Sequence, residues 1–200
     1  KRGKIVVQPI YDYISDFRKN LAAAFLEDKA CFVNIKGEQI SPLIYDDIAT
    51  ESGKLLSGPD FINGFVKVRV NDKFGFVNEL GEFAIPAIYD SADDFTRYGM
   101  ARVSINGKYG FINKMGELTI QAIYDKIEYF INSPLYIVNQ DNKWGVINEK
   151  GDKVFDIKYD KIFGINKGYI IVEINGNVER VNSSGKILSH KELEAIHNRK

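Results

Sequence analysis

An aspartate follows a tyrosine at five places in the chain, and carboxylates that recur in this way could bind cations along one face. These residues are Asp12, Asp46, Asp90, Asp125 and Asp160. A calcium site needs six or more oxygen ligands gathered closely, whereas each of these carboxylates is at least 34 residues from the next. We therefore expect each aspartate to accept hydrogen bonds from backbone N–H groups at a turn or strand end. The sequence predicts no metal site.

The other residues able to do chemistry are two histidines and one cysteine, and they do not form a cluster. His190 and His197 lie seven residues apart in a predicted terminal helix, two turns from each other and too far to bind one metal ion. Cys31 occupies a position where other copies of a repeated segment have glycine, which predicts a small buried residue and not a nucleophile. No phosphate-binding loop, nucleotide fingerprint or zinc-ligand spacing occurs. The sequence thus predicts no catalytic residues, no cofactor and no enzyme activity.

The charge balance argues against nucleic acid as a partner. Lys and Arg total 27 of the 200 residues, and Asp and Glu also total 27, so no positive excess is available to displace counterions. No apolar run approaches the length of a membrane span. The single cysteine fits a reducing compartment but does not exclude export. Because the chain begins at Lys1 without methionine, we expect a fragment or a processed form, and the compartment stays open between cytoplasm and cell envelope.

A ten-residue segment returns at a fixed interval. It occupies Lys73–Glu82, Lys108–Glu117 and Lys143–Asp152, and each copy starts 35 residues after the last. A period of this size predicts a repeat array in which one unit cannot bury its apolar face alone. Aligned on one glycine per copy, the predicted array covers residues 1–188, with units near 3–36, 37–80, 81–115, 116–150 and 151–184, followed by a tail at 189–200.

Within each unit the side chains alternate with a period of two, which predicts strands. Met100–Ile105 alternates, Asn106–Gly107 is a hairpin signal, and Tyr109–Ile112 resumes the strand. A third strand is expected at Leu118–Ile120 and a short fourth between Tyr124 and Phe130. The fold class is therefore all-β, with about five antiparallel meanders in tandem. We favour an open superhelical array over a five-bladed propeller, because about 35 residues is short for a four-stranded blade.

The C-terminal tail carries helix signals. Ser189 and Glu192 have the spacing of a capping box, and Leu193 and Ile196 share one helical face. We predict a short terminal helix that covers an exposed sheet edge.

Two further residue types recur in register. An asparagine precedes the turn glycine by three residues, where its side chain can satisfy the backbone of its own turn: Asn34, Asn78, Asn113, Asn148 and Asn182. The tyrosine before each aspartate, and the aromatic residue at the Trp144 position, could form a stacking platform for sugars or peptides. Recurring aromatic residues more often fill the core between units. The tyrosines are Tyr11, Tyr45, Tyr89, Tyr124 and Tyr159.

These residues resemble WG repeats, also called KWG repeats, a bacterial family named for its Trp-Gly pair. Lys143–Gly151 matches that pattern most fully, and Phe74–Gly75 and Tyr109–Gly110 carry other aromatic residues in place of Trp. The downstream segment Pro86–Asp90 also resembles the second half of the family's repeat. The resemblance implies a β-rich repeat of poorly defined function that serves interactions, and it carries no catalytic residues.

One loop breaks the regularity of the repeats. Fourteen residues separate Asp46 from Phe61, whereas four separate Asp90 from Phe95. Insertions in repeat proteins emerge on one face, and loops carry function more often than scaffold strands. The candidate partner contacts in this insertion are Glu51, Lys54, Leu55, Leu56 and Asp60. The alternative is a surface loop without function.

The leading functional hypothesis is a non-enzymatic bacterial interaction module that presents an extended β surface to a protein partner. The first alternative is a cell-envelope repeat array that binds carbohydrate through its repeated aromatic residues. The second is a passive array that spaces or stabilises a neighbouring domain.

Overall fold

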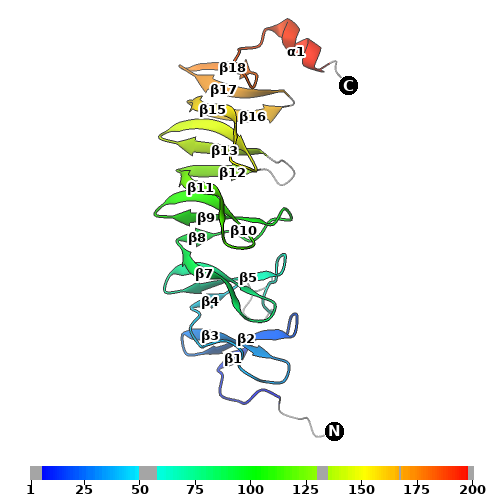
Figure 1. Ribbon diagram of the computed structural model, residues 1–200, viewed down its shortest axis with the longest axis vertical. Helices are drawn as coiled ribbons and strands as arrows, with labels where there is room; N and C mark the ends of the chain where they lie inside the picture. The colour runs from blue at the N-terminus through cyan, green and yellow to red at the C-terminus, as the bar shows by residue number, and fades with distance from the viewer. Residues whose placement is uncertain (1–5, 50–57, 130–134, 167, 198–200) are drawn as a thin grey trace. The chain divides into compact units, whose positions relative to one another are not determined.

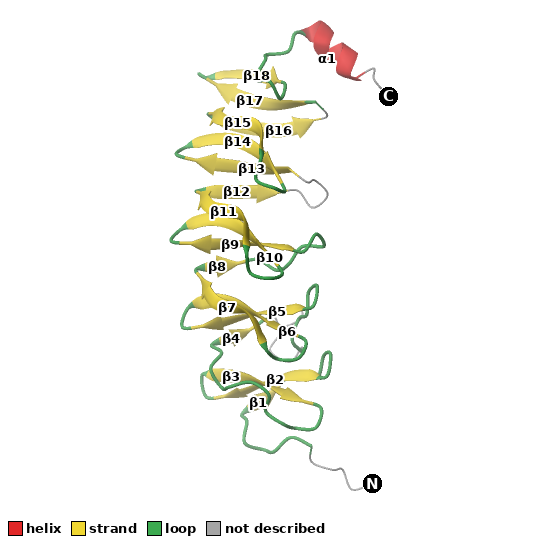
Figure 2. Ribbon diagram, in the orientation of Figure 1, coloured by secondary structure: helices red, strands yellow, loops and turns green. Residues whose placement is uncertain are grey.

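The computed structural model describes residues 6–49, 58–129, 135–166 and 168–197, and these residues form five small antiparallel sheets and one helix (Figures 1 and 2). The first sheet contains β1 (Tyr13–Ile14), β2 (Leu21–Leu26) and β3 (Lys29–Asn34), in that order. The second contains β4 (Asp47–Ile48), β5 (Phe65–Val70), β6 (Lys73–Asn78) and β7 (Phe83–Tyr89). The third contains β8 (Ser91–Ala92), β9 (Met100–Ile105), β10 (Lys108–Asn113) and β11 (Leu118–Tyr124).

The fourth sheet contains β12 (Lys126–Tyr129), β13 (Leu135–Gln140), β14 (Lys143–Asn148) and β15 (Lys153–Tyr159). The fifth contains β16 (Lys161–Asn166), β17 (Tyr169–Ile174) and β18 (Asn177–Val181), and α1 (His190–His197) follows it. No sheet of the described residues closes into a barrel. The predicted fold class, all-β tandem meanders with a short C-terminal helix, is confirmed. Among the described helical residues, no segment is long and apolar enough to span a membrane.

The sheets are offset from the units read in the sequence. β7, β11 and β15 each end at the tyrosine of a Tyr-Asp pair, and the next sheet begins just beyond the aspartate. In the second, third and fourth sheets, the glycines used to divide the sequence (Gly81, Gly116 and Gly151) lie instead in the turn between the third and fourth strands. Dividing the sequence from one of these glycines to the next therefore assigns the fourth strand of a sheet to the following unit.

The chain forms two compact units, residues 1–106 with 111–118 and residues 107–110 with 119–200. Within the first unit, one apolar cluster joins Phe32 of β3 to Val66 and Val77 of the second sheet. A separate cluster of the same unit contains Phe76, Ile85 and Tyr89 together with residues of the third sheet. The second unit has a cluster that joins Val146 and Phe155 of the fourth sheet to Ile170 of the fifth. Each core thus lies between consecutive sheets, as expected for repeats that cannot bury their apolar side alone.

The glycine after each aromatic residue is required by a bulge in the neighbouring strand. In the second sheet, Phe74 pairs with Tyr89 and Phe76 pairs with Ile85, so three residues of β7 face the single Gly75. A Cβ atom at Gly75 would lie 2.7 Å from the backbone oxygen of Ile85. At Gly110 it would lie 2.4 Å from the oxygen of Ile120, closer than any real Cβ contact. The aromatic-Gly pair therefore allows the fourth strand to pass directly over the second hairpin strand.

The recurring asparagines close the turn that leads into this bulged strand. The Oδ1 atom of Asn113 accepts hydrogen bonds from the backbone N–H groups of Met115 and Glu117, at 2.9 and 3.0 Å. The Gly116 N–H group donates to the Asn113 carbonyl at 2.9 Å, and Gly116 has φ +80°. The same contacts recur at Asn34, Asn78, Asn148 and Asn182. The predicted turn role of the asparagines is confirmed.

The recurring aspartates connect consecutive hairpins. In the second unit, the carboxylate of Asp125 accepts a hydrogen bond from the ammonium group of Lys108, and its Oδ2 atom accepts one from the Asp141 backbone N–H at 2.9 Å. Asp160 does the same with Lys143 and with the Asn175 N–H group. In the first unit, Asp46 binds Lys29 and the Asp72 N–H group, and Asp90 binds Lys73; the first aspartate, Asp12, accepts from the Glu27 N–H group. Backbone amides are the partners that the sequence predicts. The ion pair with the lysine 17 residues earlier, formed by Asp46, Asp90, Asp125 and Asp160, was not predicted.

A valine at Gly110 would collide with the strand that passes over it. We expect Gly110→Val to lower the free energy of unfolding by roughly 2–3 kcal/mol, because the backbone of β11 at Ile120 and Ala122 must move. Gly164 in β16 is the matched control, since a Cβ atom there meets no atom within 4 Å. We expect Gly164→Val to change stability by less than about 0.5 kcal/mol. Urea denaturation followed by circular dichroism compares the two, and equal losses would contradict the role assigned to the bulge.

We call the contacts by which each recurring aspartate connects two hairpins the aspartate joint. This joint also makes the stability of the fold depend on pH. The ammonium of Lys108, and then the Asp141 N–H group, lower the pKa of Asp125 in the folded chain. A lowered pKa stabilises the fold above the unfolded value of about 3.9, and this contribution is lost as pH falls through the folded pKa. We expect Asp125→Asn to be less stable than the natural chain at neutral pH. The difference should shrink as pH falls below about 4. A difference that is constant with pH in denaturant titrations would contradict the ionic contribution.

Candidate surface for partner binding

The insertion between Asp46 and Phe61 is described only at its ends. Glu51, Lys54, Leu55 and Leu56 lie outside the described residues. Asp60 is described: its backbone N–H group donates to the Ala49 carbonyl at 2.9 Å, which ties the end of the insertion to the residue after β4. The structure therefore places one of the five predicted contact residues and leaves the proposal for the other four untested.

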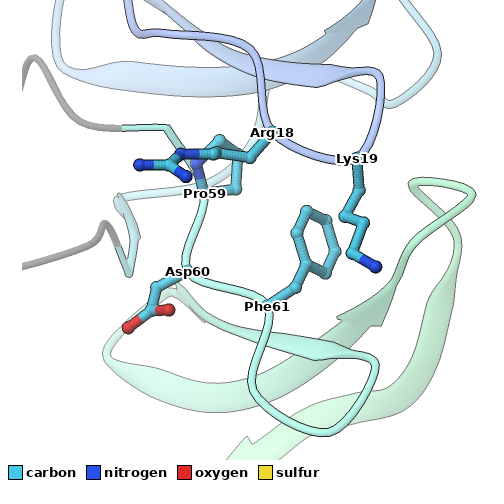
Figure 3. Close-up of a pocket in the computed structure, with 5 residues that line it drawn as sticks. All are labelled: Arg18, Lys19, Pro59, Asp60 and Phe61. Atoms are coloured by element: carbon cyan, nitrogen blue, oxygen red, sulfur yellow. The ribbon is translucent and has the colours of Figure 1, made fainter.

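A pocket of about 340 Å³ opens beside Asp60 in the first unit. It is lined by Arg18, Lys19, Pro59, Asp60 and Phe61, which come from the hairpin before β2 and from the end of the insertion (Figure 3). Charges of both signs surround it, since Lys19 also lies 3.7 Å from the carboxylate of Glu79. This lining contains no nucleophile with an adjacent base, and its mixed charge selects neither anions nor cations.

The tyrosines do not form an exposed platform. Tyr45, Tyr89, Tyr124 and Tyr159 are between 1% and 5% exposed, and Tyr11 is half-buried. Burial raises the pKa of Tyr45, Tyr89, Tyr124 and Tyr159, as expected for hydroxyl groups withdrawn from water. Phe74 and Trp144 are half-buried and pack against the apolar clusters. The expectation that the recurring aromatic residues serve core packing is confirmed for these residues.

A row of isoleucines is exposed instead. The residue immediately before the tyrosine is Ile10, Ile44 and Ile88 in the first unit, with exposed fractions of 60%, 36% and 57%, and its equivalent in the second unit is Ile123, at 47%. We call Ile10, Ile44 and Ile88 of the first unit the isoleucine row. The fifth equivalent is the exposed Lys158, which forms an ion pair with Asp156. Successive side chains of a strand point to opposite faces, so in β7 and β11 the buried Tyr89 and Tyr124 place Ile88 and Ile123 outward.

The sequence holds a signal for these residues, because an isoleucine stands directly before the tyrosine in four of the five Tyr-Asp pairs. Pro42 and Pro86, two residues before their isoleucines, are also exposed. The surface in the second and third copies thus combines Pro and Ile at matching positions.

Cys31 lies in β3 and is completely buried. Burial raises the pKa of its thiol, which keeps it protonated and unreactive at neutral pH. It takes the place of the glycine in the first repeat, where no regular fourth strand follows β3. The prediction of a small buried residue is confirmed.

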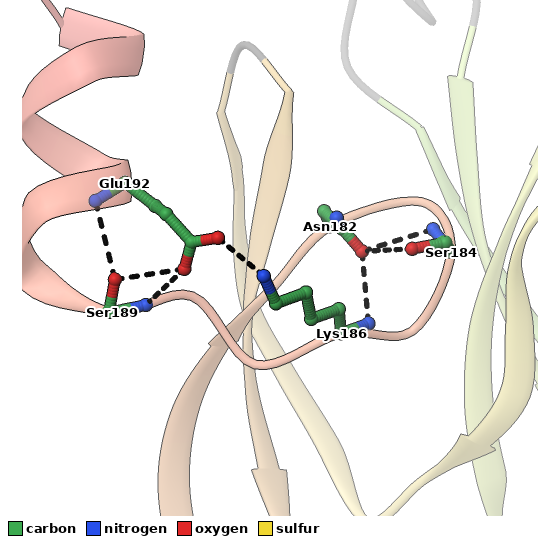
Figure 4. A network of polar contacts seen from close by, with 5 residues as sticks. All are labelled: Asn182, Ser184, Lys186, Ser189 and Glu192. Atoms are coloured by element: carbon green, nitrogen blue, oxygen red, sulfur yellow. Dashed lines mark hydrogen bonds and ion pairs between the residues drawn. The ribbon is translucent and has the colours of Figure 1, made fainter.

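The C-terminal segment contains the predicted capping box (Figure 4). The Ser189 N–H and hydroxyl groups each donate to Glu192 Oε2 at 2.9 Å, and the Glu192 N–H group lies 3.4 Å from Ser189 Oγ. The Lys186 ammonium, followed by these contacts with Ser189, lowers the pKa of Glu192 to about 2. The outer edge of β18 is paired by Ile187 and Leu188, which precede the helix. We expected α1 to cover an exposed sheet edge. The extended segment before the helix pairs with this edge of β18 instead.

His190 lies at the start of α1. Its side chain is 90% exposed, and its Nε2 atom lies 3.3 Å from Glu194. Over the whole described part of the chain, no three His, Cys, Asp or Glu side chains are grouped so that they could hold a metal ion.

Several solved structures match the chain at low sequence identity. Hsv2 of Kluyveromyces lactis is 7% identical, with a TM-score of 0.38, over 86% of this chain and 60% of that one. A protein of unknown function from Bacteroides caccae is 11% identical, with a TM-score of 0.30, over 88% of this chain and 78% of that one. The chain thus spans less than two thirds of the length of Hsv2.

No curated protein sequence matches the chain. A family model described as WG containing repeat matches residues 1–29, 74–109, 109–144 and 144–177. The match includes the aromatic-Gly pairs at Gly75, Gly110 and Gly145, which the bulged strands require. The chain belongs to the WG containing repeat family.

Proposed function

We propose that this chain is a non-enzymatic interaction module that presents an extended β surface to a protein partner. The observation that supports it is the isoleucine row, an apolar side chain exposed at the same register position in three successive copies of the first unit. Single exposed apolar residues are normal on a protein surface. Recurrence at one position is the arrangement of a surface that a partner covers.

The composition of the row favours a protein as the partner. Isoleucine offers apolar area without a hydrogen-bonding group, and protein interfaces bury such side chains at their centre. Carbohydrate binding would instead require exposed aromatic rings on which sugars stack. The four buried tyrosines cannot serve in that way. For this reason we place protein binding ahead of carbohydrate binding and of a passive spacer role.

The insertion is a second candidate contact. Asp60 is partly exposed beside the pocket, and the fixed end of the insertion lies against the first sheet: a Cβ atom at Gly58 would come within 2.4 Å of Asp16 O and of Arg18 Cγ. We propose that Glu51, Lys54, Leu55, Leu56 and Asp60 add contacts to those of the row. The two surfaces are tested separately.

The test is affinity capture from the native organism's lysate with the natural chain and two double variants. Ile44→Ser with Ile88→Ser removes apolar area from the row. Leu80→Ser with Met115→Ser is the matched control, because these side chains are 70% and 73% exposed but lie in turns outside the row. We expect the first variant to reduce capture of a specific protein by about tenfold, and the control to retain it.

A further arm deletes residues 51–57 in a chain of matched thermal stability. Loss of capture on deletion would assign a contact to the insertion, and retained capture would assign binding to the row alone. Capture of wall polysaccharide, of nothing, or of the same protein by all variants would count against the proposal.

A further inference from the structure

The chain contains three Asn-Gly pairs, and in all three both residues have positive φ. Two of these pairs, Asn63–Gly64 and Asn175–Gly176, differ in their surroundings. Asn63–Gly64 joins Ile62 to β5, and Asn175–Gly176 joins β17 to β18. Both asparagines have positive φ, 53° and 51°, and both glycines follow with φ of 92° and 77°. These are the values of a two-residue hairpin turn with both central residues in the left-handed region. The two turns therefore form a matched pair within one molecule.

The surroundings of the two side chains differ. Asn63 Nδ2 donates to the Phe95 carbonyl at 2.8 Å, and the Lys114 ammonium donates to the Asn63 carbonyl at 3.0 Å. Two contacts from the third sheet thus hold both the amide side chain and the peptide bond that follows it. The exposed Asn175 side chain forms no hydrogen bond with the described residues, and its carbonyl accepts only a 3.4 Å contact from Asn177 Nδ2.

We propose that Asn175–Gly176 is a site of spontaneous deamidation, and that the contacts of Asn63 protect the equivalent pair. The reaction uses only groups of the turn and water. The backbone nitrogen of Gly176 attacks Cγ of Asn175 and forms a C–N bond. Its proton is lost to solvent, the Cγ–Nδ2 bond breaks, and ammonia leaves. Water then opens the resulting succinimide at either C–N bond, which yields aspartate or isoaspartate, with no oxidation or reduction.

Glycine makes this attack accessible. Gly176 has no side chain to crowd its nitrogen, and a Cβ atom at this position would meet no atom within 4 Å. The attack requires the asparagine side chain and the following peptide bond to rotate toward each other. At Asn175 this rotation breaks no side-chain hydrogen bond to the described residues, whereas at Asn63 it must break the bond to Phe95.

The modification would act on the last aspartate joint. The Asn175 N–H group donates to Asp160 Oδ2 at 2.8 Å, and Asp160 also binds Lys143. Isoaspartate inserts one extra carbon into the backbone of a two-residue turn, and either product places a new carboxylate near Asp160. Like charges repel, so the joint between the fourth and fifth sheets weakens.

The test follows both pairs in the purified full chain during incubation at mildly alkaline pH, with peptide mapping by mass spectrometry. We expect Asn175 to deamidate about three- to tenfold faster than Asn63 in the folded chain, the factor that one typical hydrogen bond supplies. The same chain unfolded in urea is the control for neighbouring sequence, and there the two rates should converge. Equal rates in the folded chain, or a rate ratio unchanged by urea, would overturn the proposal.

Two variants separate protection from other causes. Lys114→Met removes the contact to the Asn63 carbonyl and should raise the rate at Asn63 without changing that at Asn175. Asn175→Gln should abolish the mass change in its peptide, because the larger imide ring forms more slowly. An unaltered mass change in that peptide would place the reaction elsewhere and refute the assignment.

Discussion

The carboxylate of the aspartate that follows each tyrosine joins one hairpin to the next. Asp125 holds the ammonium of Lys108 on one side and the turn of the following hairpin on the other, through the Asp141 N–H group. Single ion pairs at a surface contribute little, but this one also satisfies a backbone donor at a fixed place in each repeat. The joint therefore fixes the start of the next sheet relative to the hairpin before it. The core between consecutive sheets depends on that placement.

A second constraint acts inside each sheet and explains why the repeat has so little freedom in sequence. The fourth strand bulges over the glycine of the aromatic-Gly pair, and no side chain fits between the two backbones. Beside the glycine, the aromatic ring packs against the apolar cluster. The tyrosine that ends the fourth strand is buried by the same alternation. The core thus uses most of the recurring aromatic residues, and the other side of the strand stays exposed.

The residue before each buried tyrosine lies on the outward side of that strand. In β7 and β11 this side presents Ile88 and Ile123, and in β15 it presents Lys158 paired with Asp156. The apolar character of this position therefore changes to charge at the last copy. A surface assembled in this way is specified copy by copy, because each exposed residue can change without altering the buried tyrosine beside it. This separation of core and surface is what allows repeat proteins to present different surfaces on one scaffold.

The sequence by itself determined the period, the strands and the turns. These features follow from local alternation and from turn residues that need positive φ, such as Gly116, and they involve only near neighbours in the chain. The capping box at Ser189 was predictable for the same reason. Only the tertiary structure decided that Lys108 binds Asp125, that three residues bulge over each glycine, and that Asn63 is held while Asn175 is not. Those contacts join segments from about 10 to more than 30 residues apart, so they depend on strand register and sheet packing, which no local pattern encodes.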